Sequence, residues 1–400
     1  MALVFNQTPP TLSLAQSPVA FSVYEDTGLF SGSEFQYTCQ LTYWTGSASV
    51  SGSYDYYLTK YPNTSGVGIF DLSRVLNSSL NQLSYDFSSS VLYYKAAFNY
   101  NYLSGSVRVS GSNLPTLVSG LYKALDGYAL FPEPINQNVP SKTPHWPIMT
   151  DSNISQSFQI TDKGRMGVYV GGTGDPQPDR IFYQGKSNGN TYFLPTGSAY
   201  LSNSTGQIVR FPIGPAEADF PASILADLNF NGQGTWVRIQ AASGSTNLGT
   251  PINFIYECAY KYEPIRIMWK NRYGQFDYQN FYKANYKTFN TDQRTYQPQL
   301  GSWDATSLSY NTATNNSQKY IVNTTEQLTV NSDWLQESFN EIYKQLLVSD
   351  ELYWMYDQAN NLVKPLSILT NSVRFKTGVN DKLIQYTIDF SIGQTFKLII

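Results

Sequence analysis

Histidine and cysteine are scarce in this chain. His145 is the one histidine among 400 residues, and Cys39 and Cys258 are the two cysteines. So few soft ligands exclude a zinc, haem or iron–sulfur site built within one chain. His145 stands between Pro144 and Trp146, and no Gly-x-Ser-x-Gly motif is present, so serine catalysis is not expected either. We therefore expect no cofactor, no metal and no enzymatic activity.

Charged residues are also few. Asp, Glu, Lys and Arg make up 14% of the chain, against about 25% in typical soluble domains. The formal net charge is −3, and Lys and Arg form no cluster along the sequence. A nucleic-acid binder needs a basic surface that neutralises phosphates. Nucleic acid is therefore not an expected partner.

Long hydrophobic runs are missing as well. No segment reaches the ~18 consecutive apolar residues that a membrane-spanning helix needs. Residues Met1–Asn6 include no basic region of the kind that opens a secretion signal. We expect no membrane insertion and synthesis in a reducing cytoplasm, with Cys39 and Cys258 as buried thiols in strands.

Aromatic residues, in contrast, are abundant: Tyr 32, Phe 22 and Trp 7 together form 15% of the chain. Short runs of alternating apolar and polar residues, separated by Gly, Ser, Asn and Pro, are typical of β-sandwiches. Phe35–Tyr43 alternates throughout and predicts a half-buried strand. Phe98–Tyr102 and Val107–Val109, joined by a Gly-containing turn, predict a hairpin. Asp71 is the expected cap of a short helix that includes Leu72–Leu76.

Composition shifts divide the chain into three predicted domains. Five prolines crowd residues 131–148, where they favour an extended linker. We predict a mainly β fold, with tandem immunoglobulin-like β-sandwich domains over residues 1–135 and 148–262 and an α+β domain over residues 263–400. Strands in the second domain are expected over Met166–Val170, Thr191–Leu194, Ile208–Phe211 and Trp236–Ile239.

The α+β domain is predicted to carry one amphipathic helix packed on a sheet. Asp333, followed by Gln336, indicates an N-cap and a capping box. The apolar stripe of this helix is Leu335, Phe339, Ile342 and Leu346. Residues 302–327 are expected to form a polar loop. Strands are expected over Leu352–Tyr356, Ser372–Lys376 and Ile384–Ile392.

A β-hairpin over residues 265–281 is expected to organise this domain. Its defining residues are Ile265, Ile267, Trp269, Gly274, Phe276 and Tyr278. Alternation places Trp269 on the face that enters the core, and Gly274 supplies the positive φ that the turn needs. The alternative is an exposed sugar-binding platform formed by Trp269, Tyr273 and Tyr278, which the alternation disfavours.

Two segments resemble ligand-binding loops but lack essential parts. Asp227–Gly232 matches the first six positions of an EF-hand loop, yet Arg238 occupies the position of the closing glutamate. A hairpin that turns at Asn231-Gly232 is the preferred interpretation. Gly171–Gly174 resembles a phosphate-binding loop, but no Gly-Lys-Ser/Thr follows, so a flexible loop is expected. Asp175 and Asp179 form a minor candidate for a hard cation.

Glycoside hydrolysis is the remaining enzymatic alternative. It needs two carboxylates placed across a sugar, commonly beside aromatic rings. Asp277, Glu257 and Glu263 lie near the aromatic-rich hairpin and are the candidates. Strands often place such acids on solvated faces, so hydrolysis is a minor hypothesis.

Five stretches, in this order, resemble uncharacterised virion structural proteins of tailed bacteriophages, especially those of marine bacteria. They are Ser17–Phe21, Gly66–Leu76, Met268–Tyr278, Trp334–Glu337 and Asp381–Tyr386. The resemblance implies a non-enzymatic component of the tail, baseplate or tail hub, located in the virion and assembled with copies of itself and other virion proteins. It transfers no functional residue. A capsid or collar position, and a carbohydrate-binding adhesin that recognises a host-surface glycan, remain alternatives.

Overall fold

The structure is a computed structural model. It describes residues 3–26, 28, 34–45, 56–80, 91–110, 116–130, 145–152, 155–171, 178–186, 191–194, 207–231, 235–258, 260–299, 301–303, 307–309, 311–370, 372–373, 383–393 and 396–399. The chain is mainly β and sandwich-like, which confirms the predicted fold class. No helix in these ranges is long and apolar enough to cross a membrane.

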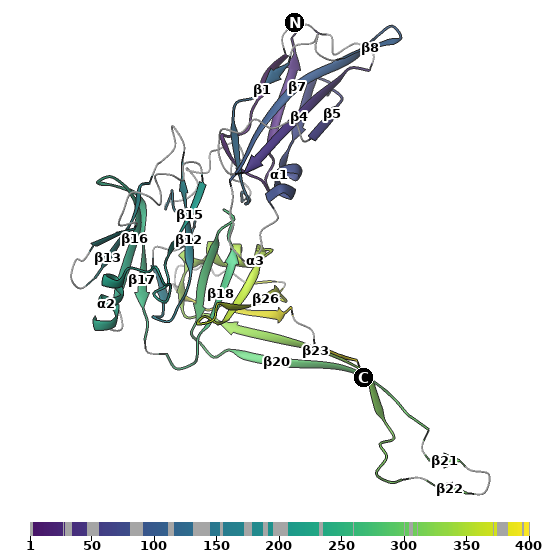
Figure 1. The fold of residues 1–400 in the computed structure, drawn as a ribbon, viewed down its shortest axis with the longest axis vertical. Coiled ribbons are helices and arrows are strands. Elements are labelled where there is room, and N and C mark those ends of the chain that lie inside the picture. Colours follow the sequence, from purple (N-terminus) through teal and green to yellow (C-terminus); the bar gives the residue numbers. More distant parts are fainter. Residues whose placement is uncertain are drawn as a thin grey trace. The chain divides into compact units, whose positions relative to one another are not determined.

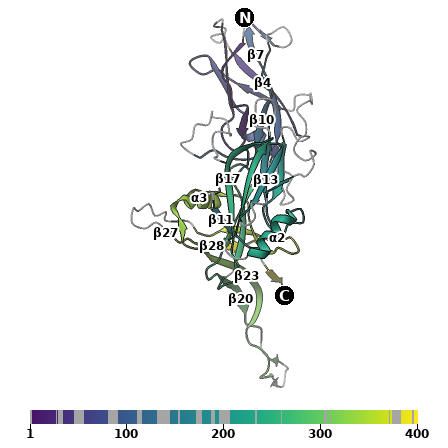
Figure 2. The same ribbon diagram turned by 90° about the vertical axis from the view of Figure 1, so that its left-hand side faces the viewer.

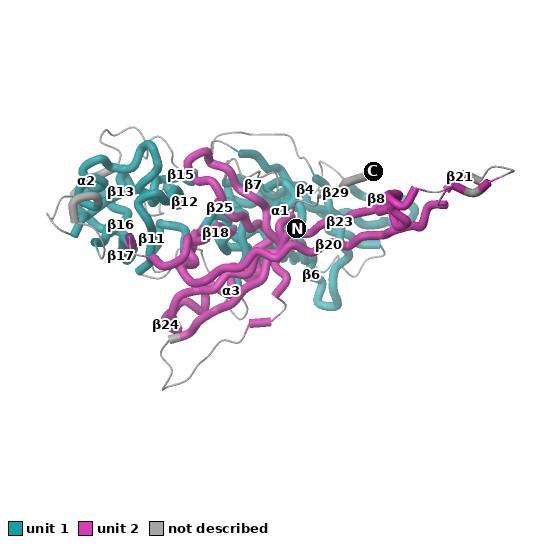
Figure 3. The backbone as a smooth tube through the Cα atoms, turned by 90° about the horizontal axis from the view of Figure 1, so that it is seen from below, with its two compact units in different colours: residues 1–256, 270–277 teal, residues 257–269, 278–400 magenta. Residues whose placement is uncertain are grey.

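The chain divides into two compact units, which Figure 3 shows in different colours. The first contains residues 1–256 and 270–277, and the second contains residues 257–269 and 278–400. A short stretch, Lys270–Asp277, thus belongs to the first unit although the chain on both sides of it belongs to the second. The division into three domains stays a prediction, because residues 131–144 lie outside the described ranges.

The first unit begins with a sandwich of two sheets (Figure 1). One sheet contains β1 (Leu3–Gln7), β3 (Ala20–Glu25) and β6 (Val67–Asp71). The other has the order β2 (Leu12–Leu14), β10 (Tyr122–Leu125), β7 (Leu92–Ser104), β4 (Gln36–Thr45) and β5 (Tyr56–Lys60), with β8 (Val107–Val109) and β9 (Leu117–Val118) paired to β7. The expected strand at residues 35–43 and the expected hairpin at 98–109 are both present.

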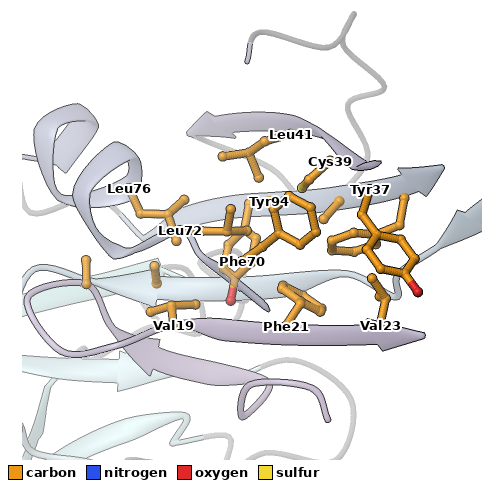
Figure 4. Packing of buried hydrophobic residues seen from close by; sticks show 14 of the residues in the cluster. Val19, Phe21, Val23, Tyr37, Cys39, Leu41, Phe70, Leu72, Leu76 and Tyr94 are labelled. Atoms are coloured by element: carbon orange, nitrogen blue, oxygen red, sulfur yellow. The ribbon is translucent and has the colours of Figure 1, made fainter. Parts of the chain in front are cut away.

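Alternate side chains of the two sheets form the sandwich core (Figure 4). Phe21 and Phe70 project from one sheet toward Tyr37 and Cys39 of the other. The Tyr37 hydroxyl accepts the Glu25 N–H at 3.0 Å and donates to a backbone carbonyl at 2.7 Å, so its polar end is satisfied inside the core. Burial raises the pKa of the Cys39 thiol to about 12, which makes it a small apolar group.

Helix α1 (Ser73–Leu80) follows β6, as the sequence predicts. The Asp71 carboxylate accepts the N–H groups of Ser73 and Val19, each at 3.0 Å. It therefore caps the helix and also binds the residue that precedes β3, the strand that pairs with β6. Leu76 and Leu80 are buried against the core.

The first unit continues with a second β region (Figure 2). Its larger sheet has the order β11 (Ser155–Phe158), β17 (Thr246–Tyr256), β16 (Trp236–Ser243), β13 (Arg180–Gly185) and β14 (Thr191–Leu194), and a ladder pairs β12 (Arg165–Val170) with β15 (Gln207–Pro212). The four strands that the sequence predicts in this region are all present. Cys258 follows β17 and is exposed, so the expectation of a buried thiol in a strand is wrong there.

Helix α2 (Ala222–Asn231) replaces the hairpin expected at Asn231-Gly232, and that prediction is wrong. Pro221 immediately precedes the helix, where its missing N–H is tolerated, and Ile224 and Leu228 are fully buried one turn apart. The β16–β17 hairpin instead turns at Gly244, which has a φ of 58°. Asp227 is therefore a helical residue rather than a member of an EF-hand loop.

The second unit is built on one large sheet. Its order is β19 (Phe276–Phe281), β18 (Ile265–Lys270), β25 (Leu352–Asp357), β26 (Leu362–Ile368), β28 (Thr387–Ile392), β23 (Gln318–Asn331) and β20 (Tyr286–Tyr296), with β29 (Phe396–Ile399) paired to β23. Two short pairs are β21 (Ser302–Trp303) with β22 (Leu308–Ser309) and β24 (Leu335–Gln336) with β27 (Leu383–Ile384). The strand expected at Ser372–Lys376 falls mostly outside the described residues.

The C-terminal helix α3 (Asn340–Val348) starts later than predicted. Leu335 lies in β24, opposite Ile384, and a 3-10 turn over Glu337–Phe339 leads into the helix. The prediction of Asp333 as N-cap is wrong, because pairing with β27 keeps the backbone extended beyond it. Asp333 pairs instead with Lys283 at 2.8 Å.

The predicted apolar stripe nevertheless gathers in one place. Leu335, Ile342 and Leu346 belong to a single apolar cluster with the large sheet, and Phe339 is half-buried against it. The helix therefore covers the sheet through the expected residues, although one of them comes from a strand.

Candidate functional site

The tip of the β18–β19 hairpin, Lys270–Asp277, is the most polar buried segment described, and all eight of its residues are buried. The Gly274 N–H donates to the Asn271 carbonyl at 3.0 Å and so closes the turn. The Asn271 side-chain oxygen accepts the N–H groups of Tyr273 and Gln275 at 3.0 and 3.1 Å. All three hydrogen bonds lie within the hairpin, and they stabilise its turn.

Two glycines allow the tip to touch the backbone of residues 126–128. A Cβ on Gly274 would overlap the Asp126 carbonyl oxygen, and a Cβ on Gly127 would overlap the Arg272 carbonyl oxygen. The Tyr128 N–H donates to the Arg272 carbonyl at 2.9 Å. Gly274 also has a φ of 73°, which favours glycine. The close approach therefore needs glycine on both segments.

Ion pairs fix the charged side chains of the tip. The Lys270 ammonium lies 2.7 Å from the Asp126 carboxylate, and both side chains are at most 4% exposed. Gln16 donates to the other Asp126 oxygen at 3.0 Å. The Arg272 guanidinium pairs with Asp151, which also accepts the hydroxyl of Tyr273 at 2.9 Å. Each of these charges thus has an opposite charge beside it, and both carboxylates accept a further hydrogen bond.

Asp277 differs because no cation pairs with it among these contacts. Its carboxyl oxygen accepts the Thr150 hydroxyl at 2.7 Å, and the Ser152 hydroxyl lies 3.5 Å away. Burial raises the pKa of Asp277 to about 7, against the opposing effect of hydrogen bonds from Thr150 and Asn271. The nearby negative charge of Asp151 raises the pKa further. Asp277 therefore changes its charge near neutral pH.

The carboxylates considered for glycoside hydrolysis have different surroundings. Asp277 is buried among hydroxyl groups of the first unit. Glu257 and Glu263 belong to the second unit, where Glu257 is half-buried and Glu263 is exposed. The neighbour of Asp277 within its unit is Asp151, whose carboxylate is paired with Arg272. That pairing favours a structural role for Asp151.

The aromatic residues considered as a sugar platform are buried. Trp269 is 1% exposed, Tyr273 is 0% exposed and Tyr278 is 5% exposed. Trp269 shares an apolar cluster with Ile265 and Ile267, and Phe276 is also buried. The Arg266 guanidinium covers the Tyr278 ring at 4.9 Å from its centroid. These rings therefore present no face to a sugar.

The remaining predicted ligands have internal partners or lie outside the described ranges. Asp179 pairs with Arg180 at 2.9 Å and accepts the Gly244 N–H, and the hydrogen bond from Arg180 lowers the pKa of Asp179. Residues 172–177, which include Asp175, are not described. Each ring nitrogen of His145 lies 2.9 Å from a backbone carbonyl oxygen. No group of three His, Cys, Asp or Glu residues suited to a metal occurs in the described part of the chain.

A second feature is exposed rather than buried: the ribbon of β20 and β23, which run side by side as an antiparallel pair (Figures 1 and 3). All eleven residues of β20 are exposed, and they include Tyr286, Phe289 and Tyr296 at 60%, 66% and 47% exposure. Tyr320 of β23 makes an edge contact with Tyr296. We call this pair of strands the aromatic ribbon; Tyr286 and Tyr296 lie on one face of β20, and Phe289 lies on the other.

The sequence does not indicate the aromatic ribbon. Residues 318–327 belong to β23 rather than to the predicted polar loop, so that prediction is wrong. Both strands are rich in Thr, Asn and Gln, and no buried face imposes an apolar alternation on β20. The available signal is the enrichment in Thr, Tyr, Phe and Val, which favours strands even without alternation.

No protein-family model and no curated protein matches this chain.

The tip predicts that Gly274→Ala destabilises the protein far more than Gly105→Ala. Both glycines have positive φ, 73° and 65°, but a Cβ at Gly105 meets nothing within 4 Å. We expect about 1 kcal/mol for Gly105→Ala from backbone strain, and about 3 kcal/mol or more for Gly274→Ala from the added backbone overlap. Urea unfolding of both variants measures the difference. Equal losses would show that the close approach at Asp126 does not matter.

The buried pair predicts that Lys270→Met costs about 3–5 kcal/mol, because the Asp126 carboxylate is left buried without its cation. Adding Asp126→Asn should recover most of this loss, since Gln16 can still donate to the amide oxygen. Thermal melts of the single and double variants measure both effects. A double variant no more stable than Lys270→Met would contradict the role of the uncompensated charge.

Asp277 predicts a pH dependence of stability. Its folded-state pKa, about 7, exceeds the ordinary value of 3.8, so the folded protein holds a proton that the unfolded chain releases. The contribution of Asp277 to stability is fully present below pH 3.8 and is lost as the pH rises to 7 and beyond. Relative to Asp277→Asn, the wild type should therefore lose melting temperature between pH 4.5 and pH 7.5, values that bracket most of this window. Parallel pH profiles of the two proteins would refute the assignment.

Proposed function

We propose that this protein is a non-enzymatic structural component of a bacteriophage virion that acts by assembling with copies of itself and with other virion proteins. A position in the tail, baseplate or tail hub is the preferred placement. The virion assignment is supported by the resemblance of five sequence stretches to such proteins. The assembly role is supported chiefly by one observation, the aromatic ribbon.

The aromatic ribbon has the composition of an interface. Tyr and Phe are enriched at protein interfaces, whereas Lys and Glu are depleted. Tyr286, Phe289 and Tyr296 lie on a strand that has no buried residue, so packing among the described residues does not explain them. The ribbon is the edge of the large sheet, where β23 also pairs with β28 and β29 and β20 pairs with β23 alone. Covering it with another protein would remove apolar area from water and stabilise it.

The charged groups at the hairpin tip support a structural role for that site. Lys270, Arg272, Asp126 and Asp151 form short pairs with one another inside the first unit. Their contacts stabilise packing of the same chain. We therefore expect these groups to stabilise the fold rather than to catalyse a reaction.

A carbohydrate-binding adhesin is the second candidate. The same exposed rings, Tyr286, Phe289 and Tyr296, have the chemistry that stacks on sugars. A capsid or collar component would use them in the same way as a tail component. Binding to a glycan array and the composition of purified virions distinguish these possibilities.

Assembly through the aromatic ribbon predicts that the triple variant Tyr286→Ser, Phe289→Ser, Tyr296→Ser associates more weakly than the wild type. We expect the dissociation constant to rise at least about tenfold, which corresponds to about 1.4 kcal/mol of lost interface energy. Size-exclusion chromatography with light scattering measures the masses over a concentration series.

The matched control introduces serine at three exposed tyrosines of the first unit. They are Tyr56, Tyr57 and Tyr61, which are 44%, 67% and 67% exposed. This control should associate as the wild type does. Mass spectrometry of purified virions should find the chain at a fixed copy number. A strictly monomeric wild type that binds no virion protein would refute the assembly proposal, and glycan binding by that monomer would support the adhesin instead.

A further inference from the structure

The outer edge of β20 is open. β20 ends the strand order of the large sheet and pairs with β23 on one side only. The far side of β23 is occupied by β29 at residues 321–324 and by β28 at residues 327–331. Among the described strands, none pairs with the other edge of β20. Its free N–H and C=O groups can therefore bond to an added strand.

The strand itself is regular enough to accept a partner. The pairing with β23 shifts register between Arg294 and Thr295, whose partners are Ile321 and Lys319. The extra residue is thus Tyr320 on β23, and β20 continues without an insertion. β20 also contains no proline.

Two of the three charged residues of β20 are arranged symmetrically about Gln293. Asp292 and Arg294 flank it and lie on one face of the strand, because residues two apart share a face. Across the ribbon they oppose Asn323 and Ile321, which are uncharged. Neither forms an ion pair within the part of the chain that the structure describes.

We propose that β20 pairs antiparallel with β20 of a second copy of this chain, about a twofold axis through Gln293. In this register Asp292 of each copy opposes Arg294 of the other, so the symmetry forms the same ion pair twice. Thr291 opposes Thr295, which is a favourable cross-strand pair. The inference rests on the proposed assembly function and names its partner and its register.

The alternation of side chains along β20 excludes the other pairing of opposite charges. Lys287 and Asp292 are five residues apart and therefore lie on opposite faces of the strand. Residues that oppose each other in an antiparallel pair share a face, so Lys287 cannot oppose Asp292. The Lys287 ammonium instead lies 4.4 Å from the centroid of the Trp354 ring. Among the three charged residues of β20, the axis through Gln293 therefore gives the one twofold register that opposes unlike charges.

The test is a charge exchange. Asp292→Arg makes both flanking side chains cationic, and Arg294→Asp makes both anionic, so each variant alone opposes like charges across the axis. Each should raise the dissociation constant ~10-fold at low salt. An equimolar mixture of the two should associate as tightly as the wild type, as should the double variant Asp292→Arg/Arg294→Asp. Sedimentation equilibrium with one labelled variant measures all of these.

Lys287→Glu is the charge-change control: Lys287 opposes no charged residue in the proposed register, so this variant should leave association unchanged. If Lys287→Glu weakens association as much as Asp292→Arg does, association does not depend on this register and the proposal is wrong. If every variant associates as the wild type does, β20 pairing is refuted while the assembly function survives. A wild type that stays monomeric and binds no virion protein refutes both.

Crosslinking gives a readout independent of charge. Gln293 opposes itself across the axis, so Gln293→Cys should form a disulfide-linked dimer under mild oxidation. The background carries Cys258→Ser, because Cys258 is exposed. Thr288→Cys, which does not face itself, should remain monomeric on a non-reducing gel. Equal crosslinking of the two variants would contradict the register.

Discussion

The buried ion pair between Lys270 and Asp126 is the interaction on which packing at the hairpin tip depends. Removing two charges from water is costly, and only a short contact with further hydrogen bonds offsets that cost. The 2.7 Å separation and the bond from Gln16 provide both. This geometry requires the backbones of the two segments to touch, and Gly127 and Gly274 are the residues that permit it.

The same approach organises the other polar groups of the tip. Asn271 holds the turn and donates to the Met149 carbonyl at 3.0 Å, while Arg272 reaches Asp151. The Tyr273 ring joins an apolar cluster that includes Leu125 and Trp146. A polar network of this kind is stabilising only when nearly every member is satisfied, so it specifies one arrangement of the chain.

The aromatic ribbon reverses the usual distribution of residues. Charged groups are buried at the tip, whereas Tyr286, Phe289 and Tyr296 face water on the ribbon. The charged side chains of the tip pair with other residues of the chain, whereas the aromatic side chains of the ribbon are exposed. This contrast supports the proposed assembly role, because a surface that binds another subunit is exposed in the isolated chain.

Local pattern was sufficient for much of the fold. Alternation located β4 and β28, because side chains two apart share a face and one face is buried. The burial of Trp269 follows from the same alternation, and that of Ile342 and Leu346 follows from the apolar stripe of a helix. The sequence pattern gave a wrong prediction for Asp227–Gly232. The run of polar residues and glycine suggested a hairpin turn, but residues 227–231 belong to a helix in which Ile224 and Leu228 are buried.

The sequence by itself determined the mainly β class, the strand faces and the scarcity of catalytic and metal-binding side chains. Only the tertiary structure decided which distant residues meet: Lys270 with Asp126, and Asp277 with Thr150. It also decided that Leu335 lies in a strand and that β20 is an exposed edge. The physical reason is that periodicity reports the burial of one face, whereas ion pairs, raised pKa values and open edges depend on neighbours more than 100 residues away or on the place of a strand in its sheet.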